Sequence, residues 1–348
     1  MKTSFTTAGA AAVRSSEMPD PFYRDFEDRF RGSRDLIKMR LEVYLPFVLP
    51  LHERYPDVPS VDLGCGRGEW LELLDDRDIH VVGVDIDEGM LLDCRTRSLP
   101  AHHCDALTYL ATLPTESQLI VSAFHVVEHI EFAQLRMIVA EALRVLKPGG
   151  LLILETPNPE NVRVGSCNFY LDPTHRNPIP PDLLSFVTGY YGFRRTKVLR
   201  LQESRDVVAR YKEQPGLHKR SALSLLDVIA GSSPDYAVVA QKHAEPDIFN
   251  QLNEQFNRPY GVQMEDLGIQ REVDINHRFA ELRLQVDRAE SHTLQTLTKI
   301  SQLSAQVSLM QRSLSWRITR PLRAISPFFG VARGSRLRGI IKALLRSH

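Results

Sequence analysis

The chain has 348 residues, with 43 Lys and Arg against 43 Asp and Glu, so its formal net charge at pH 7 is zero. This length suits one large domain with an additional segment, or two domains, and 43% hydrophobic residues suit a globular protein. The four cysteines form no Cys-x-x-Cys pair, which argues against a disulfide framework or a zinc ribbon and favours a reducing compartment.

The first part of the chain predicts a disordered leader and then a helical region. Residues 1–20 are threonine-rich and too polar for a secretory signal. Residues 21–54 carry apolar side chains at helical spacing with arginines and lysines between them, which predicts a helical lid in front of the first strand. No apolar run in the sequence reaches the roughly 18 residues that span a bilayer, so we expect a soluble or peripheral protein.

Between residues 60 and 155, short apolar segments alternate with amphipathic ones. This alternation predicts an α/β fold of Rossmann type, with a parallel sheet and helices on both faces. The motif Pro148-Gly149-Gly150 is expected to end the last helix before the fifth strand. Two further strands are expected at Lys197–Leu201 and Tyr236–Gln241, and the domain is predicted to span residues 21–244. The expected strands of the first part are Ser60–Leu63, His80–Asp85, His102–Cys104, Leu119–Ala123 and Leu151–Glu155; the expected helices are Glu69–Asp75, Glu88–Arg97, Leu107–Leu113 and Phe132–Val145.

Residues 60–69, SVDLGCGRGE, predict a nucleotide-binding turn between the first strand and the first helix of this sheet. Gly64, Gly66 and Gly68 leave no Cβ atoms inside the turn, so a cofactor can lie on the backbone and meet the N–H groups of the next helix. Asp85 ends the second strand, where a carboxylate can accept hydrogen bonds from a ribose diol. The alternative is a tight structural turn that binds no ligand.

The spacing Gly-x-Gly-x-Gly, with Asp62 two residues before it, resembles motif I of the class I S-adenosylmethionine (SAM) methyltransferases. The resemblance implies SAM as the cofactor, held by Asp62, the three glycines and the aspartate of the second strand. It also places Asp105 and Ala106 where these enzymes bind the adenine amino group. A helix cap is the alternative role for Asp105. Cys65, inside the turn, is expected to be a small buried filler rather than a nucleophile.

Side chains that can donate or accept a proton are concentrated after the fourth strand, in His125-Val126-Val127-Glu128-His129. Ligands of α/β sheets bind at this carboxyl edge. A proline-rich loop, Tyr170–Pro178, is expected to cover the site and contributes His175. Methyl transfer to a hydroxyl group gains from a base that takes the proton, so His125, His175 and Glu128 are the predicted catalytic residues. The alternative for each histidine is a core side chain that hydrogen-bonds a backbone carbonyl.

A metal-free site is the main expectation, but the same side chains are candidate metal ligands. The spacing of His125, Glu128 and His129, with His175 from the covering loop, suits a divalent ion that polarises an acceptor oxygen. The arrangement is similar to that of the metal-dependent small-RNA 3′-end methyltransferases, which carry Glu-x-x-Glu-His and a later histidine. In this chain the first position of that pattern is a histidine.

After a polar connector at residues 245–270, a four-three spacing of apolar residues predicts a coiled coil at residues 271–314. Two threonines weaken the middle of this seam. The alternative is a single amphipathic helix that folds back on the catalytic domain. The twelve seam positions are Ile275, Phe279, Leu282, Val286, Ala289, Thr293, Thr296, Ile300, Leu303, Val307, Met310 and Leu314.

The C-terminal residues 315–348 predict a basic amphipathic tail that associates with a membrane. After Glu290 the chain has ten basic residues and no acidic one, whereas the preceding part has 33 basic and 43 acidic residues. Aromatic and aliphatic side chains lie between the basic ones, which suits an anionic membrane surface. Nucleic acid is the alternative partner, and the high apolar content makes it the weaker one.

Six segments together resemble the methyltransferase part of bacterial O-antigen chain-terminating enzymes: FYRDFEDRFRGSRDLIKMRLEVYLPF, VDLGCGRGEW, FHVVEHI, LKPGGLLILETPNPEN, NFYLDPTHRNPIPPDLL and SPDYAVVAQK. The resemblance covers residues 21–244. Those enzymes methylate the non-reducing end of a lipid-linked polysaccharide, and the better-known members also contain a kinase domain. Here the predicted coiled coil leaves no room for a kinase, which implies a sugar hydroxyl rather than a phosphate as acceptor. The resemblance also implies that Tyr23, Arg31 and Arg34 touch the SAM carboxylate or the acceptor.

The expected function is therefore SAM-dependent O-methylation of a sugar at the end of a lipid-linked surface polysaccharide, which would end chain growth. The expected location is cytoplasmic, at the inner face of the cytoplasmic membrane. Expected partners are the glycan acceptor, polysaccharide-assembly glycosyltransferases, anionic lipid and further copies of the chain, but no nucleic acid. Two alternatives stay open: a small-molecule O-methyltransferase of quinone type, and a membrane-bound scaffold for glycosyltransferases with a vestigial SAM fold.

Overall fold

The computed structural model describes residues 29–30, 32–212 and 223–319. The chain divides into two compact units, Met1–Asp274 and Ile275–His348. The predicted leader, most of the basic tail, and the predicted cofactor contacts Tyr23 and Arg31 lie outside the described residues. The first unit contains the sheet and the predicted site residues that the structure describes.

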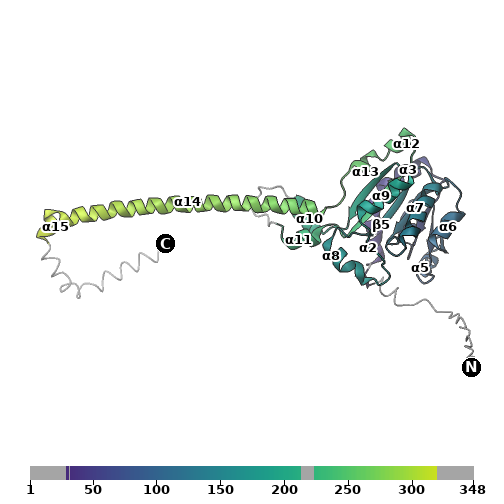
Figure 1. Cartoon of the computed structure of the whole chain (residues 1–348), viewed down its shortest axis with the longest axis horizontal. Helices are drawn as coiled ribbons and strands as arrows, with labels where there is room; N and C mark the ends of the chain where they lie inside the picture. The colour runs from purple at the N-terminus through teal and green to yellow at the C-terminus, as the bar shows by residue number, and fades with distance from the viewer. Residues whose placement is uncertain (1–28, 31, 213–222, 320–348) are drawn as a thin grey trace, which may run out of the picture. The chain divides into compact units, whose positions relative to one another are not determined.

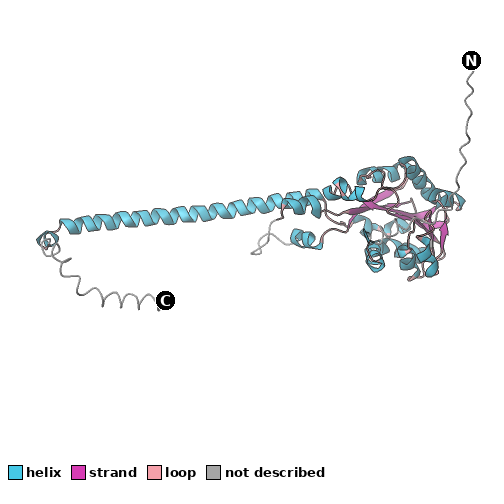
Figure 2. Cartoon of the chain, turned by 90° about the horizontal axis from the view of Figure 1, so that it is seen from below, coloured by secondary structure: helices cyan, strands magenta, loops and turns pink. Residues whose placement is uncertain are grey.

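The first unit is built on a seven-stranded sheet with the strand order β3-β2-β1-β4-β5-β7-β6. Strands β1 to β5 pair in parallel, as the alternating pattern predicted. Strand β7 differs, because it runs antiparallel to both β5 and β6. Figure 2 shows the strands in the middle of this unit with helices on both sides. The strands are β1 Ser60–Leu63, β2 Val81–Asp85, β3 Ala101–His103, β4 Gln118–Phe124, β5 Leu146–Pro157, β6 Arg195–Leu201 and β7 Asp235–Gln241.

The helices of the sheet lie close to their predicted positions, and two of them, α4 and α7, have the predicted bounds. Helix α7 ends at Val145 as predicted, but Pro148-Gly149-Gly150 do not lie between the helix and the strand, because β5 begins at Leu146 and contains them. The register shifts there between Gln118 and Ile120 of β4, and Gly149 adopts a φ of +82° that favours glycine. The helices (Figure 1) are α2 Arg34–Leu41, η1 Glu42–Tyr44, α3 Leu45–Arg54, α4 Glu69–Asp75, α5 Leu91–Thr96, α6 Ala106–Thr112, α7 Phe132–Val145, α8 Val162–Ser166, η2 Asn168–Leu171, α9 Pro181–Tyr191, α10 Arg205–Lys212, α11 Leu225–Gly231, α12 Pro246–Asn250, α13 Asn253–Asn257, α14 Met264–Arg312 and α15 Leu314–Ile318.

Two apolar clusters, one on each face of the sheet, hold these layers together. Alternate residues of a strand point to opposite faces, so Ile153 belongs to one cluster and Leu152 and Leu154 belong to the other. Helices α6, α7 and α9 cover the second face. The predicted lid, α2 to α3, is an integral part of the first cluster, because Tyr44 and Phe47 are completely buried there.

Residues 245–270, predicted as a connector, also contribute buried side chains to the first unit. Ile248 and Phe256 join the first apolar cluster. The guanidinium group of Arg195 lies between the rings of Phe249 and Phe256, with its carbon 3.9 Å and 4.0 Å from the two ring centres. Such stacking of a cation on aromatic rings stabilises the contact by about 1 kcal/mol. This segment therefore packs against the sheet rather than linking two bodies freely.

The described part of the second unit is helical. Helix α14 extends over 49 residues, and every residue from Asn276 to Arg312 is exposed. The apolar seam of the predicted coiled coil is therefore uncovered in the single chain. The helix ends at Arg312, and Ser313 caps the short helix α15 with its hydroxyl group. The last predicted seam position, Leu314, thus lies beyond α14, and the seam on this helix ends at Met310.

Among the described residues, no helix combines the length and the apolar character that crossing a bilayer requires.

Candidate active site

The glycine turn between β1 and α4 has the geometry that its sequence predicted. Gly64, Gly66 and Gly68 all adopt positive φ angles, of +66°, +52° and +79°. A Cβ atom on Gly64 would lie 2.4 Å from Cγ2 of Val126, so any other residue would clash there. Left-handed backbone and close packing both require glycine at this position.

Asp85 holds the glycine turn from the end of the neighbouring strand. Its Oδ2 atom accepts a hydrogen bond of 2.8 Å from the backbone N–H of Gly66, and its Oδ1 atom accepts one of the same length from the N–H of Asp87. A carboxylate has about four acceptor positions, and the contact of Asp85 with a ribose hydroxyl stays a prediction. The structure thus places Asp85 beside the turn, as its sequence position predicted.

Arg34 of α2 also contacts the glycine turn, through backbone carbonyl groups. Its guanidinium group donates to the carbonyl oxygens of Arg67 and Gly68, at 2.6 Å and 3.2 Å, and pairs with the carboxylate of Glu72. These contacts position the backbone that would carry the cofactor. Arg34 does not line the cavity, and its direct contact with the cofactor or acceptor stays a prediction.

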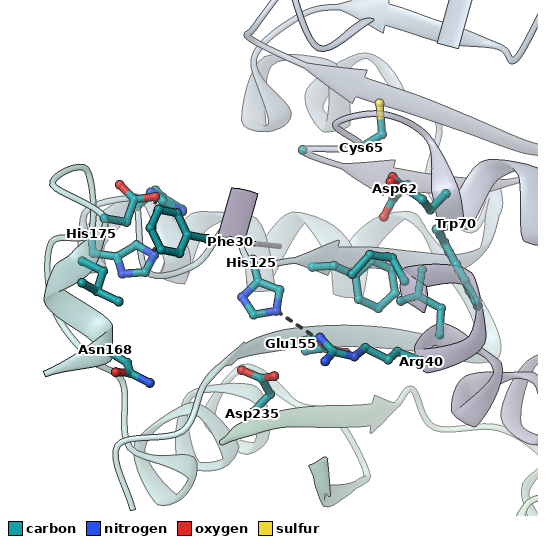
Figure 3. A pocket seen from close by; sticks show the side chains of 18 residues that line it. Phe30, Arg40, Asp62, Cys65, Trp70, His125, Glu155, Asn168, His175 and Asp235 are labelled. Carbon is teal, nitrogen blue, oxygen red and sulfur yellow. Dashed lines mark ion pairs between the residues drawn. The ribbon is translucent and has the colours of Figure 1, made fainter. Parts of the chain in front are cut away.

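A cavity of about 350 Å³ opens next to this turn. Figure 3 shows Asp62, Cys65 and Trp70 at one end, Asn168 and His175 at the other, and His125 between them. Ten of the eighteen lining residues have charged or polar side chains, and most of these lie away from the glycine turn. The lining residues are Phe30, Ile37, Arg40, Leu41, Asp62, Gly64, Cys65, Glu69, Trp70, Phe124, His125, His129, Glu155, Asn168, Leu171, Asp172, His175 and Asp235.

Asp62 and Cys65 line the glycine end of the cavity, and both side chains are buried. Asp62 is 2% exposed and accepts a 2.7 Å hydrogen bond from the hydroxyl group of Ser122. Cys65 is buried, and hydrogen bonding with Cys94 together with burial raises the pKa of its thiol strongly. A thiol that stays protonated at neutral pH is a poor nucleophile, as expected for a buried filler.

Asp105 occupies the N-cap of α6. Its Oδ1 atom accepts hydrogen bonds from the backbone N–H and the hydroxyl group of Thr108, at 2.9 Å and 3.0 Å. Asp105 is exposed, and neither it nor Ala106 lines the cavity. The capping role is therefore present, and the predicted contact of both residues with adenine stays a prediction.

His125 lies between two buried glutamates. Its Nδ1 atom lies 3.2 Å from Oε1 of Glu128, and its Nε2 atom lies 3.3 Å from Oε1 of Glu155. His125 adopts a φ of +56°, which is rare for a residue with a side chain and marks a locally strained turn. The other oxygen of Glu128 accepts from the hydroxyl group of Thr156, and that of Glu155 accepts from the hydroxyl group of Tyr44.

These contacts decide the protonation state of His125. Burial lowers its pKa, but the carboxylates of Glu128 and Glu155 outweigh burial and hold the pKa well above the usual value of 6.5. Burial likewise raises the pKa of Glu128, yet His125 brings it below the usual value. His125 is thus an imidazolium at neutral pH and has no lone pair for another proton. In this arrangement His125 and Glu128 are partners in one buried contact, and their predicted catalytic roles stay predictions.

His129 and His175 lie side by side at the other end of the cavity, with ring centres 4.7 Å apart. The Nδ1 atom of His175 lies 2.5 Å from the carbonyl oxygen of Phe169 and must donate to it. The hydroxyl group of Thr174 donates to Asp172, so its oxygen accepts from Nδ1 of His129 at 2.8 Å. Both rings therefore carry a proton on Nδ1, and in the neutral form of either ring the lone pair is on Nε2.

Asp235 is a site residue that the sequence reading missed. It begins β7, pairs with Pro157 at the end of β5, and lines the cavity near His125 and Arg40 (Figure 3). Burial raises its pKa, and despite the opposing effect of His125 the value is about 6. A carboxylate with this pKa is mostly ionised at pH 7 and is still basic enough to accept a proton during catalysis.

Comparisons with known proteins agree with this geometry. A family model described as a methyltransferase domain matches residues 61–154. A crystal structure of a SAM-dependent methyltransferase from Archaeoglobus fulgidus is 32% identical, with a TM-score of 0.54, over 64% of this chain and 100% of that chain.

Two curated relatives match smaller parts of the chain. Trans-aconitate 2-methyltransferase from Sinorhizobium medicae is 34% identical over 39% of this chain and 48% of its own length. A ubiquinone biosynthesis O-methyltransferase from Hahella chejuensis is 28% identical over 38% of this chain and 56% of its own length. The chain thus spans about half the length of these relatives.

Proposed function

The chain belongs to the class I SAM-dependent methyltransferases, and from this premise we propose that it methylates a hydroxyl group of a sugar at the end of a lipid-linked surface polysaccharide. The observation that carries the choice of acceptor is the polar lining of the cavity away from the glycine turn. His129, Asn168, Asp172, His175 and Asp235 present hydrogen-bonding groups there. A sugar with several hydroxyl groups needs such partners, whereas an apolar quinone ring does not.

The residues at the glycine end fit SAM. Three positive φ angles give the turn the tight backbone that a nucleotide-binding loop needs, and Gly64 lets the turn pack directly on Val126. Trp70 lines the cavity and is 2% exposed, and among the described residues its indole Nε1–H has no hydrogen-bond partner. A buried donor without a partner is costly, and an acceptor atom of a bound ligand would satisfy it. Asp62, the glycine turn and Asp85 would hold SAM, which supplies a methyl group bound to a positively charged sulfur.

The protein's part in the reaction is to align the acceptor and to remove its proton. Class I methyl transfer gains most from alignment of the reacting atoms. The acceptor oxygen loses its proton as the new O–C bond forms, and Asp235 is the side chain that we assign to accept it. The ring of His125 lies within hydrogen-bond distance of one oxygen of Glu128 and one oxygen of Glu155, so both carboxyl groups already have a partner. The predicted base His175 retains a lone pair on Nε2 and takes a different role below.

Association of several copies through α14 is part of the proposal. The exposed seam places Val286, Ile300 and Val307 at one set of positions and Leu282 and Leu303 at the other. β-branched residues at one position and leucine at the next favour a parallel two-stranded coiled coil. The helix propensity of its residues alone gives an isolated helix little stability, so packing against a partner helix would stabilise α14. With the basic segment 315–348 on an anionic membrane, the pair would place two catalytic domains near lipid-linked acceptors and the glycosyltransferases that extend them.

A small-molecule O-methyltransferase is the second candidate. The similarity to an enzyme of ubiquinone biosynthesis supports it, as do the apolar cavity residues Phe30, Ile37, Leu41 and Leu171. An enzyme of this kind has no evident need for the long helix α14 or for the basic tail, which favours the glycan.

Parallel assays with the purified chain and isotopically labelled SAM distinguish these acceptors. One assay offers lipid-linked polysaccharide from the source organism, and the other offers a quinone-type phenol at the same concentration. Label that enters the polysaccharide and is released with it by mild acid supports the proposal. Label in the phenol alone overturns the proposal in favour of the second candidate, and SAM binding without transfer to either acceptor favours a scaffold.

A further inference from the structure

Glu128, His129 and His175 bring three potential metal-ligating atoms within 4.8 Å of one another, and the two histidines line one end of the cavity. From this geometry we propose that the three side chains bind a divalent transition-metal ion. Bonds of about 2.1 Å require ligand atoms about 3.4 Å apart in a tetrahedral site, so a small side-chain movement closes the site.

The two histidines have the orientation that metal ligands require. Each ring donates from Nδ1, His175 to the carbonyl oxygen of Phe169 and His129 to the hydroxyl oxygen of Thr174. Metal-binding histidines almost always donate their second N–H to a carbonyl, a carboxylate or a similar acceptor, because this fixes the ring and the tautomer. The Thr174 hydroxyl is itself oriented by Asp172, at 2.6 Å. Both Nε2 lone pairs are therefore preset for a ligand at this end of the cavity.

The surrounding charges favour a cation. Glu128 is 1% exposed and contributes its carboxylate directly. Asp172, Glu155 and Asp235 also line the cavity, and so does the guanidinium group of Arg40. A buried carboxylate needs a partner, and the ring of His125 that contacts Glu128 also contacts Glu155. A divalent ion next to Glu128 would add positive charge where carboxylates are in excess.

The donor set narrows the choice of metal. Two imidazole nitrogens and one carboxylate oxygen suit Zn²⁺, Fe²⁺, Co²⁺ or Mn²⁺, whereas Mg²⁺ and Ca²⁺ prefer sites made of oxygen atoms. Three protein ligands leave at least one position open for water or a substrate oxygen. If the proposed function holds, the hydroxyl group of the acceptor would fill that position and become more acidic, and Asp235 would take its proton.

Metal binding is tested on the full chain without SAM and without an acceptor, so the result does not depend on the proposed function. The protein is first treated with a chelator, dialysed and titrated with Co²⁺, whose visible absorption reports coordination by nitrogen. Isothermal titration with Zn²⁺ gives the stoichiometry and the affinity. We expect one equivalent of metal per chain, and at least a 10-fold weaker affinity for His129→Ala and for His175→Ala.

Two further variants keep the test independent of misfolding. Thr174→Val leaves all three ligands in place but removes the acceptor for His129 Nδ1, and we expect about a 10-fold loss of affinity. His102→Ala removes an exposed histidine of β3 outside the cavity and should bind as the unaltered chain does. Absence of Co²⁺ binding to the unaltered chain, or equal affinity in the His129→Ala, His175→Ala and His102→Ala variants, overturns the proposal.

Discussion

The Nε2 atom of His125 lies 3.3 Å from Oε1 of Glu155, so the residue after β4 forms an ion pair with the end of β5. On its other side, the Nδ1 atom of the same ring meets Glu128 at 3.2 Å. One imidazolium thus links two buried carboxylates across neighbouring strands. This arrangement makes His125 a charged structural element of the active site.

Removal of this imidazolium should destabilise the fold. His125→Ala leaves two buried carboxylates without their shared partner, and we expect the free energy of unfolding at pH 6 to fall by about 3 kcal/mol. The folded-state pKa of His125 is raised, so its stabilisation is complete below pH 6.5 and is lost as the pH rises through that raised pKa. Urea unfolding at pH 6 and pH 9, with His102→Ala as control, measures both effects. The account would be contradicted if the difference in unfolding free energy between the unaltered chain and His125→Ala were larger at pH 9 than at pH 6.

The glycine turn should not tolerate a side chain at Gly64. Gly64→Ala introduces a Cβ atom 2.4 Å from Val126 Cγ2 at a φ of +66°, and we expect SAM binding to weaken at least 10-fold. The double variant Gly64→Ala, Val126→Ala relieves the clash but not the backbone strain, so it should recover part of the affinity. Gly189→Ala in α9 is the matched control, because a Cβ atom there meets no other atom within 4 Å. Equal SAM affinity of Gly64→Ala and Gly189→Ala in calorimetry would show that the turn does not carry the cofactor.

Asp235 should set the acidic limb of the pH-rate profile. Its carboxylate accepts a proton only when ionised, so kcat/KM should rise with pH through about 6, the pKa that burial gives this group. Asp235→Asn should lower kcat about 100-fold and remove this limb. The exposed Asp182→Asn in α9 serves as the control. An unchanged limb near pH 6 in the Asp235→Asn variant would assign the limb to another group.

The seam of α14 should determine the oligomeric state. Val286 and Ile300 are 54% and 56% exposed, and Val286→Lys with Ile300→Lys places two charges in the seam without touching the first unit. We expect light scattering to give a dimer for the unaltered chain and the monomer mass of 39.6 kDa for this variant. Ser291→Lys with Ala305→Lys adds the same charge on the opposite side of the helix and should remain dimeric. Identical masses for all three proteins would contradict the proposed association through the seam of α14.

The sequence predicted the nucleotide-binding half of the site well, because local chemistry determines it. The positive φ angles of the glycine turn need glycine, and the apolar run of β1 leads directly into this turn. The position of Asp85 could be predicted in the same way, because neighbouring parallel strands end at the same edge of the sheet. The start of α4 was predicted for a similar reason, because Gly68 precedes this helix as its N-cap.

The other half of the site depends on topology and electrostatics that spacing does not show. Asp235 stands at the beginning of a strand, and it reaches the carboxyl edge of the sheet only because β7 runs antiparallel to β5. His125 was predicted as a base from its residue type, but its pKa depends on Glu155, which lies 30 positions later in the chain. Recognition that the last strand of such a sheet reverses direction would have pointed to Asp235.

Product analysis with the purified chain tests the central claim most directly. Lipid-linked polysaccharide is incubated with SAM labelled in the methyl group, and the terminal sugar is then released and analysed by mass spectrometry. The account predicts one labelled O-methyl group on the terminal sugar, and almost none with Asp85→Ala, which loses a carboxylate that holds the glycine turn. Label on internal sugars, on nitrogen or on no sugar at all, from a chain that binds SAM, would contradict the proposed terminal O-methylation.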